Sequence, residues 1–238
     1  MGLLEKYKAE VGTFIGVCHK VAARRFTTSH GGNLAWKVAD DVIIITATRL
    51  AKGEHTPADV VFIDGKGTVL EGTRKPTGEV PMYLTFFRER PDVRSVIHCH
   101  PVCCGAYAVT QAENALMRPV YPEVILEIGP VPVVPYATPL TQALADNFKP
   151  FLPKYNAFLM ENHGLAMLTP GDIDWAFHLV DELESAADSL LRAQALGLIK
   201  EMGRPEIEEM DQIVTIRKLA RCGAPGVNKS LADLYCGK

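Results

Sequence analysis

The segment from Ser95 to His100 places the strongest limit on what this chain can fold into. Its sequence, Ser-Val-Ile-His-Cys-His, begins with apolar and β-branched residues, which favour a β-strand. Side chains two positions apart on a strand project from the same face of the sheet. His98 and His100 are therefore expected to lie side by side, with Cys99 on the opposite face. Two imidazoles placed in this way supply half of the ligands of a divalent metal site.

Two residues elsewhere in the chain can complete such a site. Glu79 stands just before Pro81, a residue that suits the first turn of a helix. His163 lies in Asn162-His163-Gly164, between two apolar segments. A carboxylate and a third imidazole are common ligands of divalent metals. The four side chains together predict a metalloenzyme.

Apolar periodicity and turn residues predict a mixture of helices and strands. The predicted helices are 3–25, 81–90 and a long one ending near 196, and the predicted strands are 42–46, 60–63, 68–70, 95–100, 131–134, 157–160 and 165–168. Thr169 is expected to cap the last helix, ahead of Pro170 and Asp172. At 238 residues and 47% hydrophobic side chains, the chain is expected to form a single α/β domain over residues 1–238.

The composition argues against several classes of protein. The formal net charge is −3 and the basic residues are scattered among acids, so the chain has no basic field for nucleic acid. No apolar run approaches the roughly 20 residues that a membrane-spanning helix needs, and the first residues do not form a signal sequence. We therefore expect a cytoplasmic protein that contacts neither nucleic acid nor membrane. The six cysteines lack metal-site spacing and are expected to be reduced thiols.

Two loops have features of an anion site. Gly31-Gly32-Asn33 allows close approach of a ligand to the backbone and offers a side-chain amide. Thr77-Gly78 lies at the predicted helix start, where free N–H groups and the helix dipole favour negative charge. A tight turn and an ordinary helix cap explain the same residues equally well, so the residues alone leave both interpretations open.

The motifs taken together resemble one family. The sequence is similar to the class II aldolase/adducin family, and in particular to its sugar-phosphate aldolases related to fuculose-1-phosphate aldolase. The segments that carry the resemblance are Gly31-Gly32-Asn33, Thr46-Ala47-Thr48, Phe62-Ile63-Asp64-Gly65, Thr77-Gly78-Glu79, Arg90-Pro91-Asp92-Val93, Val96 to Pro101, Val134-Pro135-Tyr136 and Asn162-His163-Gly164. They occur in the family's order along nearly the whole chain.

The resemblance implies a fold, a metal and a set of roles. The fold would be a central, mostly antiparallel sheet flanked by helices, and the protein would be a homotetramer with its sites at subunit interfaces. Glu79, His98, His100 and His163 would bind Zn²⁺, or Mn²⁺ or Co²⁺, with Glu79 also acting as acid and base. Asn33, Thr48, Thr77 and Gly78 would hold a phosphate, and Tyr121 would reach a neighbouring subunit's site to protonate the aldehyde end.

The sequence departs from the family's pattern in three places. Thr77-Gly78 replaces a usual pair of serines, Arg49 follows Thr48 where glycine is common, and His30 replaces a small or hydroxyl residue. Arg49 and His30 either face solvent or add positive charge beside the anion site, which would suit a substrate with a carboxylate.

The expected activity is reversible cleavage of a ketose 1-phosphate to dihydroxyacetone phosphate and an aldehyde through a metal-stabilised enediolate. A decarboxylase or oxo-acid aldolase of the same fold is the main alternative. A pentulose-phosphate 4-epimerase fits less well, because those enzymes typically have aspartate at the Glu79 position and a later histidine, whereas no histidine follows His178. A non-catalytic scaffold, as in adducin, would not need the four ligands.

Overall fold

The computed structural model describes residues 1–237, which form eight strands in one sheet. The strands are β1 (Asn33–Ala39), β2 (Val42–Ile45), β3 (Val61–Ile63), β4 (Val69–Glu71), β5 (Ser95–Cys99), β6 (Val133–Val134), β7 (Ala157–Met160) and β8 (Gly164–Thr169). Their spatial order is β4-β3-β2-β1-β5-β8-β7-β6. Every neighbouring pair is antiparallel except β6 and β7, which are parallel. The predicted, mostly antiparallel sheet is confirmed.

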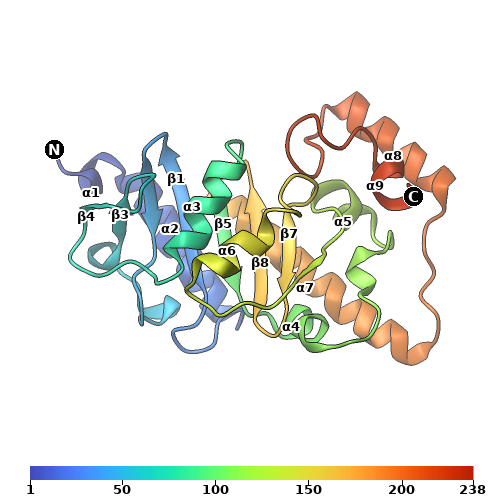
Figure 1. Cartoon of the computed structure of the whole chain (residues 1–238), viewed down its shortest axis with the longest axis horizontal. Coiled ribbons are helices and arrows are strands. Elements are labelled where there is room, and N and C mark those ends of the chain that lie inside the picture. Colours follow the sequence, from blue (N-terminus) through green and yellow to red (C-terminus); the bar gives the residue numbers. More distant parts are fainter. Residues whose placement is uncertain (238) are drawn as a thin grey trace.

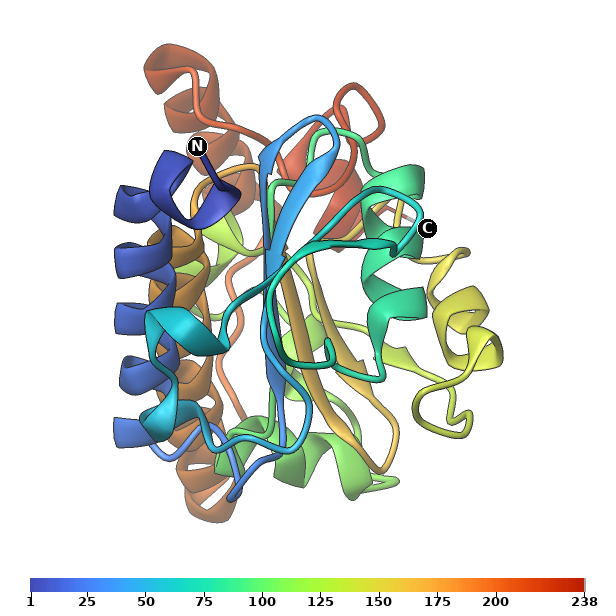
Figure 2. The same ribbon diagram turned by 90° about the vertical axis from the view of Figure 1, so that its left-hand side faces the viewer.

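Helices cover both faces of this sheet (Figure 2). They are α1 (Leu3–Lys6), α2 (Lys8–Ala23), α3 (Val80–Glu89), α4 (Val102–Val109), α5 (Pro122–Glu127), α6 (Gln142–Phe148), α7 (Ile173–Leu196), α8 (Arg204–Arg217) and α9 (Leu231–Cys236), with 3₁₀ turns η1 (Lys52–Glu54), η2 (Pro57–Asp59) and η3 (Ala115–Met117). Seen edge-on, α2 and α7 lie on one face and α3 and α6 on the other. The result is a helix–sheet–helix arrangement in three layers.

Because side chains alternate along each strand, the core consists of two apolar clusters, one on each face of the sheet. On β5, Ile97 packs in the cluster that contains α2 and α7, whereas Val96 packs in the cluster that contains α3 and α6. Because the side-chain period of a strand is two, His98 shares the face of Val96 and Cys99 shares the face of Ile97. The face of the sheet that carries His98 is therefore the face covered by α3, the helix that Glu79 precedes.

The structure corrects two predicted element boundaries. The single helix expected over 3–25 is interrupted at Tyr7, whose backbone (φ −109°, ψ 31°) is not helical. Thr169 does not cap α7. It is the last residue of β8, paired with Ser95, and the cap is Asp172, whose side chain accepts the N–H of Trp175 at 2.8 Å. Sheet pairing outweighs the local capping preference of Thr169 because the strand is buried.

The chain after α7 runs along the end of the molecule far from the N-terminus, where α8 and α9 lie beside α5 (Figure 1). A small apolar cluster joins these helices: Ile125, Ile207, Met210, Val214, Leu231 and Ala232. Arg90, only 1% exposed, ties this segment to the sheet. Its guanidinium donates to the carboxylate of Asp92 and to the Gly223 carbonyl, at 2.7 and 2.9 Å.

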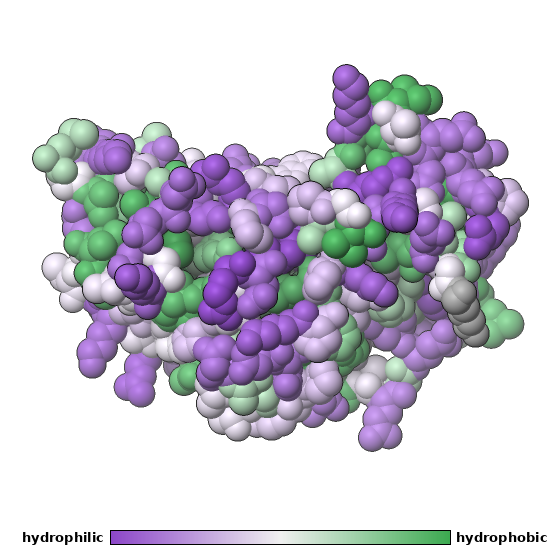
Figure 3. Space-filling model, turned by 45° about the horizontal axis from the view of Figure 1, so that its top comes forward, coloured by the Kyte–Doolittle hydropathy of each residue, from purple (hydrophilic) through white to green (hydrophobic). Residues whose placement is uncertain are grey.

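The surface of the molecule is ordinary for a folded domain. Viewed from its upper side, hydrophilic residues cover most of the face and hydrophobic residues form scattered groups (Figure 3). None of the helices in residues 1–237 combines the length and the apolar composition needed to cross a lipid bilayer. All six cysteines are free thiols, as predicted.

Candidate metal centre

His98 and His100 lie at the end of β5, in the middle of the sheet. His98 is paired with Asn33 of β1 on one side and with Ala166 of β8 on the other. His100 follows the last residue of the strand, and the two rings are 4.9 Å apart between centroids. The side-by-side placement expected from the strand period is therefore present. Because strands flank β5 on both sides, the backbone that carries the pair is firmly held.

His163 joins the pair from the turn between β7 and β8. Its ring centroid is 4.7 Å from that of His98, and one donor atom from each of the three histidines lies within 4.8 Å of the others. Gly164 makes this approach possible. A Cβ added there would lie 2.6 Å from both the Cys99 carbonyl oxygen and the His100 ring, a separation that no side chain tolerates. Glycine therefore follows His163 in this turn because the backbone at position 164 packs directly against the end of β5.

Glu79 comes from the residue just before α3 and is 4% exposed. Its carboxylate oxygens lie 3.6 Å from Nε2 of His98 and 3.8 Å from Nε2 of His163. The other ring nitrogen of His98, Nδ1, faces the Leu165 carbonyl oxygen at 2.9 Å. Since a carbonyl only accepts, Nδ1 carries the proton and Nε2 presents its lone pair to Glu79 and His100, as in metal-binding histidines.

Burial controls the protonation of this cluster. It lowers the pKa of His98 to about 4, that of His100 to about 3 and that of His163 to about 4, with charges on neighbouring side chains adding smaller effects. Burial also raises the pKa of Glu79, an effect opposed by the histidines and by a hydrogen bond from Asn33. The three imidazoles are therefore neutral near pH 7, which is the form that binds metals.

The four side chains fit a divalent cation. Nε2 of His100 and Nε2 of His98 are only 3.2 Å apart, a separation at which two lone pairs repel unless a proton or a cation lies between them. Within residues 1–237, Glu79 Oε2 and His163 Nδ1 are buried without a hydrogen-bond partner. A buried carboxylate oxygen in this condition is destabilised. Three neutral nitrogens and one oxygen are a donor set suited to Zn²⁺, Mn²⁺ or Co²⁺.

The lowered pKa values lead to a prediction about pH. Metal affinity is expected to persist from neutral pH down to about pH 5 and to fall as the pH drops toward about 4, because only then do protons compete for the imidazoles. Histidines with an ordinary pKa near 6.5 would lose the metal earlier. Equilibrium dialysis against Zn²⁺ across this range measures the midpoint. Loss of metal centred near pH 6.5 would contradict the assignment.

A cavity of about 310 Å³ opens above the cluster. Its walls include all of the residues predicted to bind the substrate's anionic group: His30, Asn33, Thr48, Arg49, Thr77 and Gly78. Thr77 and Asn33 are buried, whereas His30, Thr48, Arg49 and Gly78 are exposed toward the opening. The Thr77 hydroxyl accepts the N–H of Glu79 at 3.3 Å, so the anion wall and the proposed acid–base residue share one short turn.

Sequence reasoning missed Pro139 and Leu140, which close one side of this cavity. The backbone of Leu140 is left-handed (φ 68°), and its side chain lies where a Cβ on Gly78 would approach to 3.0 Å. The loop before α6 carries no chemical group that would mark it as part of a site. Only its position over Gly78 does so.

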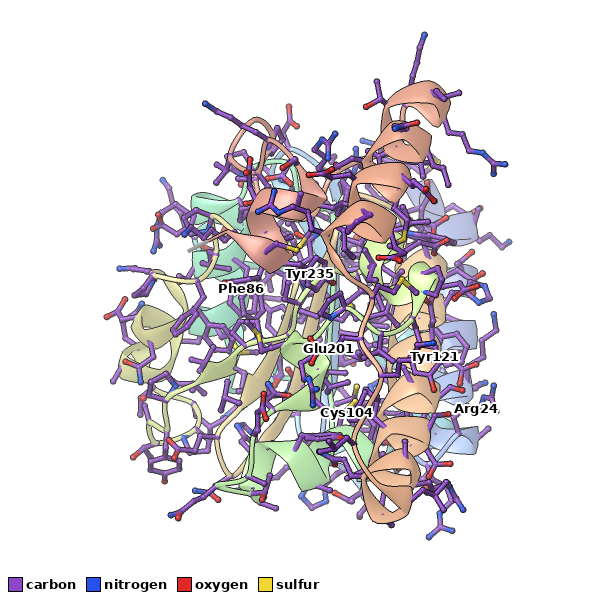
Figure 4. The ribbon with its side chains drawn as sticks, turned by 90° about the vertical axis from the view of Figure 1, so that its right-hand side faces the viewer. Arg24, Phe86, Cys104, Tyr121, Glu201 and Tyr235 are labelled. Carbon is purple, nitrogen blue, oxygen red and sulfur yellow. The ribbon has the colours of Figure 1, made fainter. Side chains whose placement is uncertain are left out.

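Tyr121 does not line this cavity. It precedes α5 and borders a different cavity, of about 230 Å³, with Glu123, Glu182 and Ser185. Figure 4 shows Tyr121 beside α7 and Phe86, on α3, across the sheet from it. Because Tyr121 packs on the α2 and α7 face and His98 projects from the other, it cannot serve the histidines of its own chain. Its action on a neighbouring subunit stays a prediction.

The fold and the site together define a class: three-layer α/β proteins in which a mostly antiparallel sheet carries a three-histidine, one-glutamate cluster beneath a small cavity. Comparison with known sequences identifies the family. The profile of the Class II Aldolase and Adducin N-terminal domain matches residues 13–191. The chain belongs to this family, as its motifs indicated, and is a class II aldolase-type protein.

Several relatives are similar over most of their length. A 5-deoxy-D-ribulose 1-phosphate aldolase of Bacillus thuringiensis is 30% identical over 87% of this chain and 95% of its own. A 3-oxo-tetronate 4-phosphate decarboxylase of Pectobacterium atrosepticum is 28% identical over 69% of this chain and 75% of its own. The crystal structure of YgbL from Klebsiella pneumoniae, a putative aldolase/epimerase/decarboxylase, superposes with a TM-score of 0.79 at 25% identity, covering 88% and 99% of the two chains.

Proposed function

We propose that this protein is a metal-dependent aldolase that reversibly cleaves a ketose 1-phosphate to dihydroxyacetone phosphate and an aldehyde. The observation that carries the proposal is the buried Glu79, within 3.8 Å of two histidines, beneath a cavity whose walls offer anion ligands. The similarity to a sugar-phosphate aldolase over 87% of the chain supports the same reaction. The substrate would accordingly be a small phosphorylated molecule.

The metal centre and Glu79 divide the chemistry between them. A divalent cation held by Glu79, His98, His100 and His163 would supply Lewis acidity toward the substrate's oxygens. As the carbon–carbon bond breaks, an enediol(ate) forms and its carbon must gain a proton. Glu79 is placed to give and take that proton, because burial raises the pKa of its carboxyl group and brings it nearer to neutral pH, where an acid–base catalyst works best.

Two other groups of residues complete the proposed site. The Asn33 amide, the Thr48 and Thr77 hydroxyls and the Gly78 backbone would hold the phosphate, and would fix the substrate's orientation over Glu79. Tyr121 of a neighbouring subunit would accept the proton that the substrate's hydroxyl loses as it becomes the aldehyde, and would return it to that oxygen in the reverse condensation. This role requires an oligomer, a homotetramer by the family resemblance. The support for this role is that Tyr121 is half-buried and borders a cavity remote from its own chain's histidines.

A substrate panel tests the proposed reaction. Protein loaded with Zn²⁺, Mn²⁺ or Co²⁺ is incubated with ketose 1-phosphates of different chain length and stereochemistry, and dihydroxyacetone phosphate is measured by a coupled reductase assay. Release of dihydroxyacetone phosphate from at least one member is expected. Failure of every ketose 1-phosphate with fully loaded protein would overturn the proposal. Chelation of the metal serves as the control, because it should stop the reaction.

A decarboxylase acting on a phosphorylated oxo-acid is the second candidate, and Arg49 favours it. Arg49 lines the cavity with its backbone in the left-handed region (φ 57°), and it forms no ion pair within residues 1–237. Such a backbone in a non-glycine residue costs about 1 kcal/mol and is often retained at functional sites. A free guanidinium there would match a carboxylate. The similarity to a 3-oxo-tetronate 4-phosphate decarboxylase agrees with this alternative.

Substitution of Arg49 separates the two candidates. If the substrate carries a carboxylate, Arg49→Ala is expected to raise its KM by about tenfold or more, because a charge-assisted hydrogen bond is lost, and to change the KM of a ketose 1-phosphate much less. Carbon dioxide release and dihydroxyacetone phosphate formation are measured on the same preparations. Arg192→Ala, at an exposed arginine of α7 outside the cavity, is the matched control. Unchanged kinetics on a carboxylate substrate would remove the argument for the decarboxylase.

A further inference from the structure

Lys52 is an unusual residue for a buried position. It begins the 3₁₀ turn η1, which packs on α2 (Figure 2), and its side chain is 1% exposed. A buried ammonium is strongly destabilising unless it is paired, yet within residues 1–237 no carboxylate lies within ion-pair distance of it. Its Nζ instead donates to two backbone carbonyl oxygens, of Leu50 at 3.0 Å and of His30 at 3.3 Å.

These two carbonyls belong to the two loops that form the outer wall of the cavity. One loop contains His30 and leads into Asn33 at the start of β1, and the other contains Thr48 and Arg49. Lys52 itself does not line the cavity. The loops are about twenty residues apart in the chain. The Lys52 ammonium connects them on the side that faces away from the cavity.

Each loop also contains a left-handed residue directly before the carbonyl that Lys52 binds. Ser29 has φ 47° and precedes His30, and Arg49 has φ 57° and precedes Leu50. Each such conformation costs a non-glycine residue about 1 kcal/mol. Strained backbone persists only where its surroundings hold it, and here the two strained segments are joined by a single ammonium.

The charge of Lys52 also extends into the site. Nζ of Lys52 lies 3.3 Å from the carbonyl oxygen of His30, which lines the cavity, so the ammonium stands directly behind that wall. A positive charge in this position attracts an anion bound in the cavity, and buried charges are screened little by salt.

We propose that Lys52 is a positioning residue: it clamps the His30 and Arg49 loops in the geometry that receives an anionic group, and it supplies fixed positive charge behind that group. The ligand is a phosphate monoester, so this inference rests on the proposed function. Lys52 is not a nucleophile, because its ammonium points at backbone carbonyls and is screened from the cavity. The wall that selects the substrate thus depends on a residue that never touches it.

Substitution of Lys52 by methionine tests the proposal. Lys52→Met keeps a side chain of similar size but removes the charge and both hydrogen bonds, and it also removes the cost of burying an unpaired ammonium. The dissociation constant of the metal-loaded protein for inorganic phosphate is expected to rise by about tenfold. Amide exchange at residues 29–33 and 49–51 is expected to quicken to a similar degree. Metal stoichiometry should stay at the wild-type value, and a thermal melt checks that the variant is folded.

Two further variants make the test decisive. Lys66→Met, at an exposed turn, is the matched control and should change neither phosphate affinity nor exchange. Lys52→Gln keeps a side-chain donor and removes the charge, and it replaces Lys52→Met if that variant does not fold. Folded Lys52 variants with wild-type phosphate affinity and wild-type exchange in both loops would overturn the proposal. If the wild-type protein binds no phosphate, the proposed function fails, and the exchange rates alone then decide whether Lys52 clamps the loops.

Discussion

Replacing His98 with alanine is expected to abolish stoichiometric binding of a divalent metal and to lower kcat/KM by at least about a thousandfold, because Lewis-acid stabilisation contributes several kcal/mol. His98 is the central residue of the cluster. Its ring is 4.9 Å from that of His100 and 4.7 Å from that of His163. Its Nδ1–H is oriented by the Leu165 carbonyl. Removal of this ring leaves His100 and His163 without the residue that lies between them and creates an empty space beneath the cavity.

Metal analysis of protein purified without chelator, followed by kinetics with added metal, checks this result. His178→Ala is the matched control. His178 lies on the surface of α7, where it contacts Asp174 at 3.4 Å, so its loss should leave metal content and kcat/KM unchanged. A His98→Ala protein that still bound one equivalent of metal with wild-type affinity would show that the cluster is not the metal centre. A thermal melt of metal-free protein separates loss of metal from loss of folding.

Replacing Glu79 with glutamine is expected to lower kcat by about 10²- to 10⁴-fold, the usual contribution of a general acid–base residue, while most of the metal remains bound. Glutamine has the size of glutamate and cannot exchange the proton. Three histidines stay in place to hold the cation. Because kcat falls and the substrate's anionic group is still recognised, KM should change by much less than kcat.

Kinetics at saturating metal, together with metal stoichiometry, check the role of Glu79. Glu161→Gln is a suitable control, because Glu161 lies two residues before His163 and binds the Tyr136 N–H, outside the cavity. A Glu79→Gln protein with wild-type kcat would exclude proton transfer by Glu79. Full recovery of kcat on adding metal would show that Glu79 binds the metal but does not transfer the proton.

Local chemistry made part of this site predictable. The apolar lead-in and the two-residue period place His98 and His100 on one face and Cys99 on the other, and the structure agrees. Pro81 marks the start of α3 correctly, with Glu79 just before it. In both cases the signal is a property of a few consecutive residues, so no knowledge of the rest of the fold is needed.

Other features could not be derived in that way. The assignment of Thr169 as a helix cap was wrong because its neighbours in the sheet, which lie far away in the sequence, compete with the local preference. Pro139 and Leu140 border the cavity only because a loop folds over Gly78. Lys52 has no motif, and its importance follows from the His30 carbonyl, which tertiary structure brings to an ammonium that also binds the neighbouring Leu50 carbonyl.

By itself, the sequence determined a mixed α/β class and the placement of His98 and His100 on one face of a strand, because strand period, helix starts and turn residues act over a few positions. Its motifs implied the family and the mostly antiparallel sheet through their resemblance to known proteins. Only the tertiary structure decided that Glu79 and His163, which are 84 positions apart in the sequence, approach within 3.8 Å. It also decided that Tyr121 lies on the opposite face of the sheet from the histidines of its own chain. The hydrogen bonds of the buried Lys52 to both cavity loops likewise appear only in the folded protein. The physical reason is that these contacts depend on sheet order and layer packing, which bring distant segments together and which no short stretch of sequence specifies.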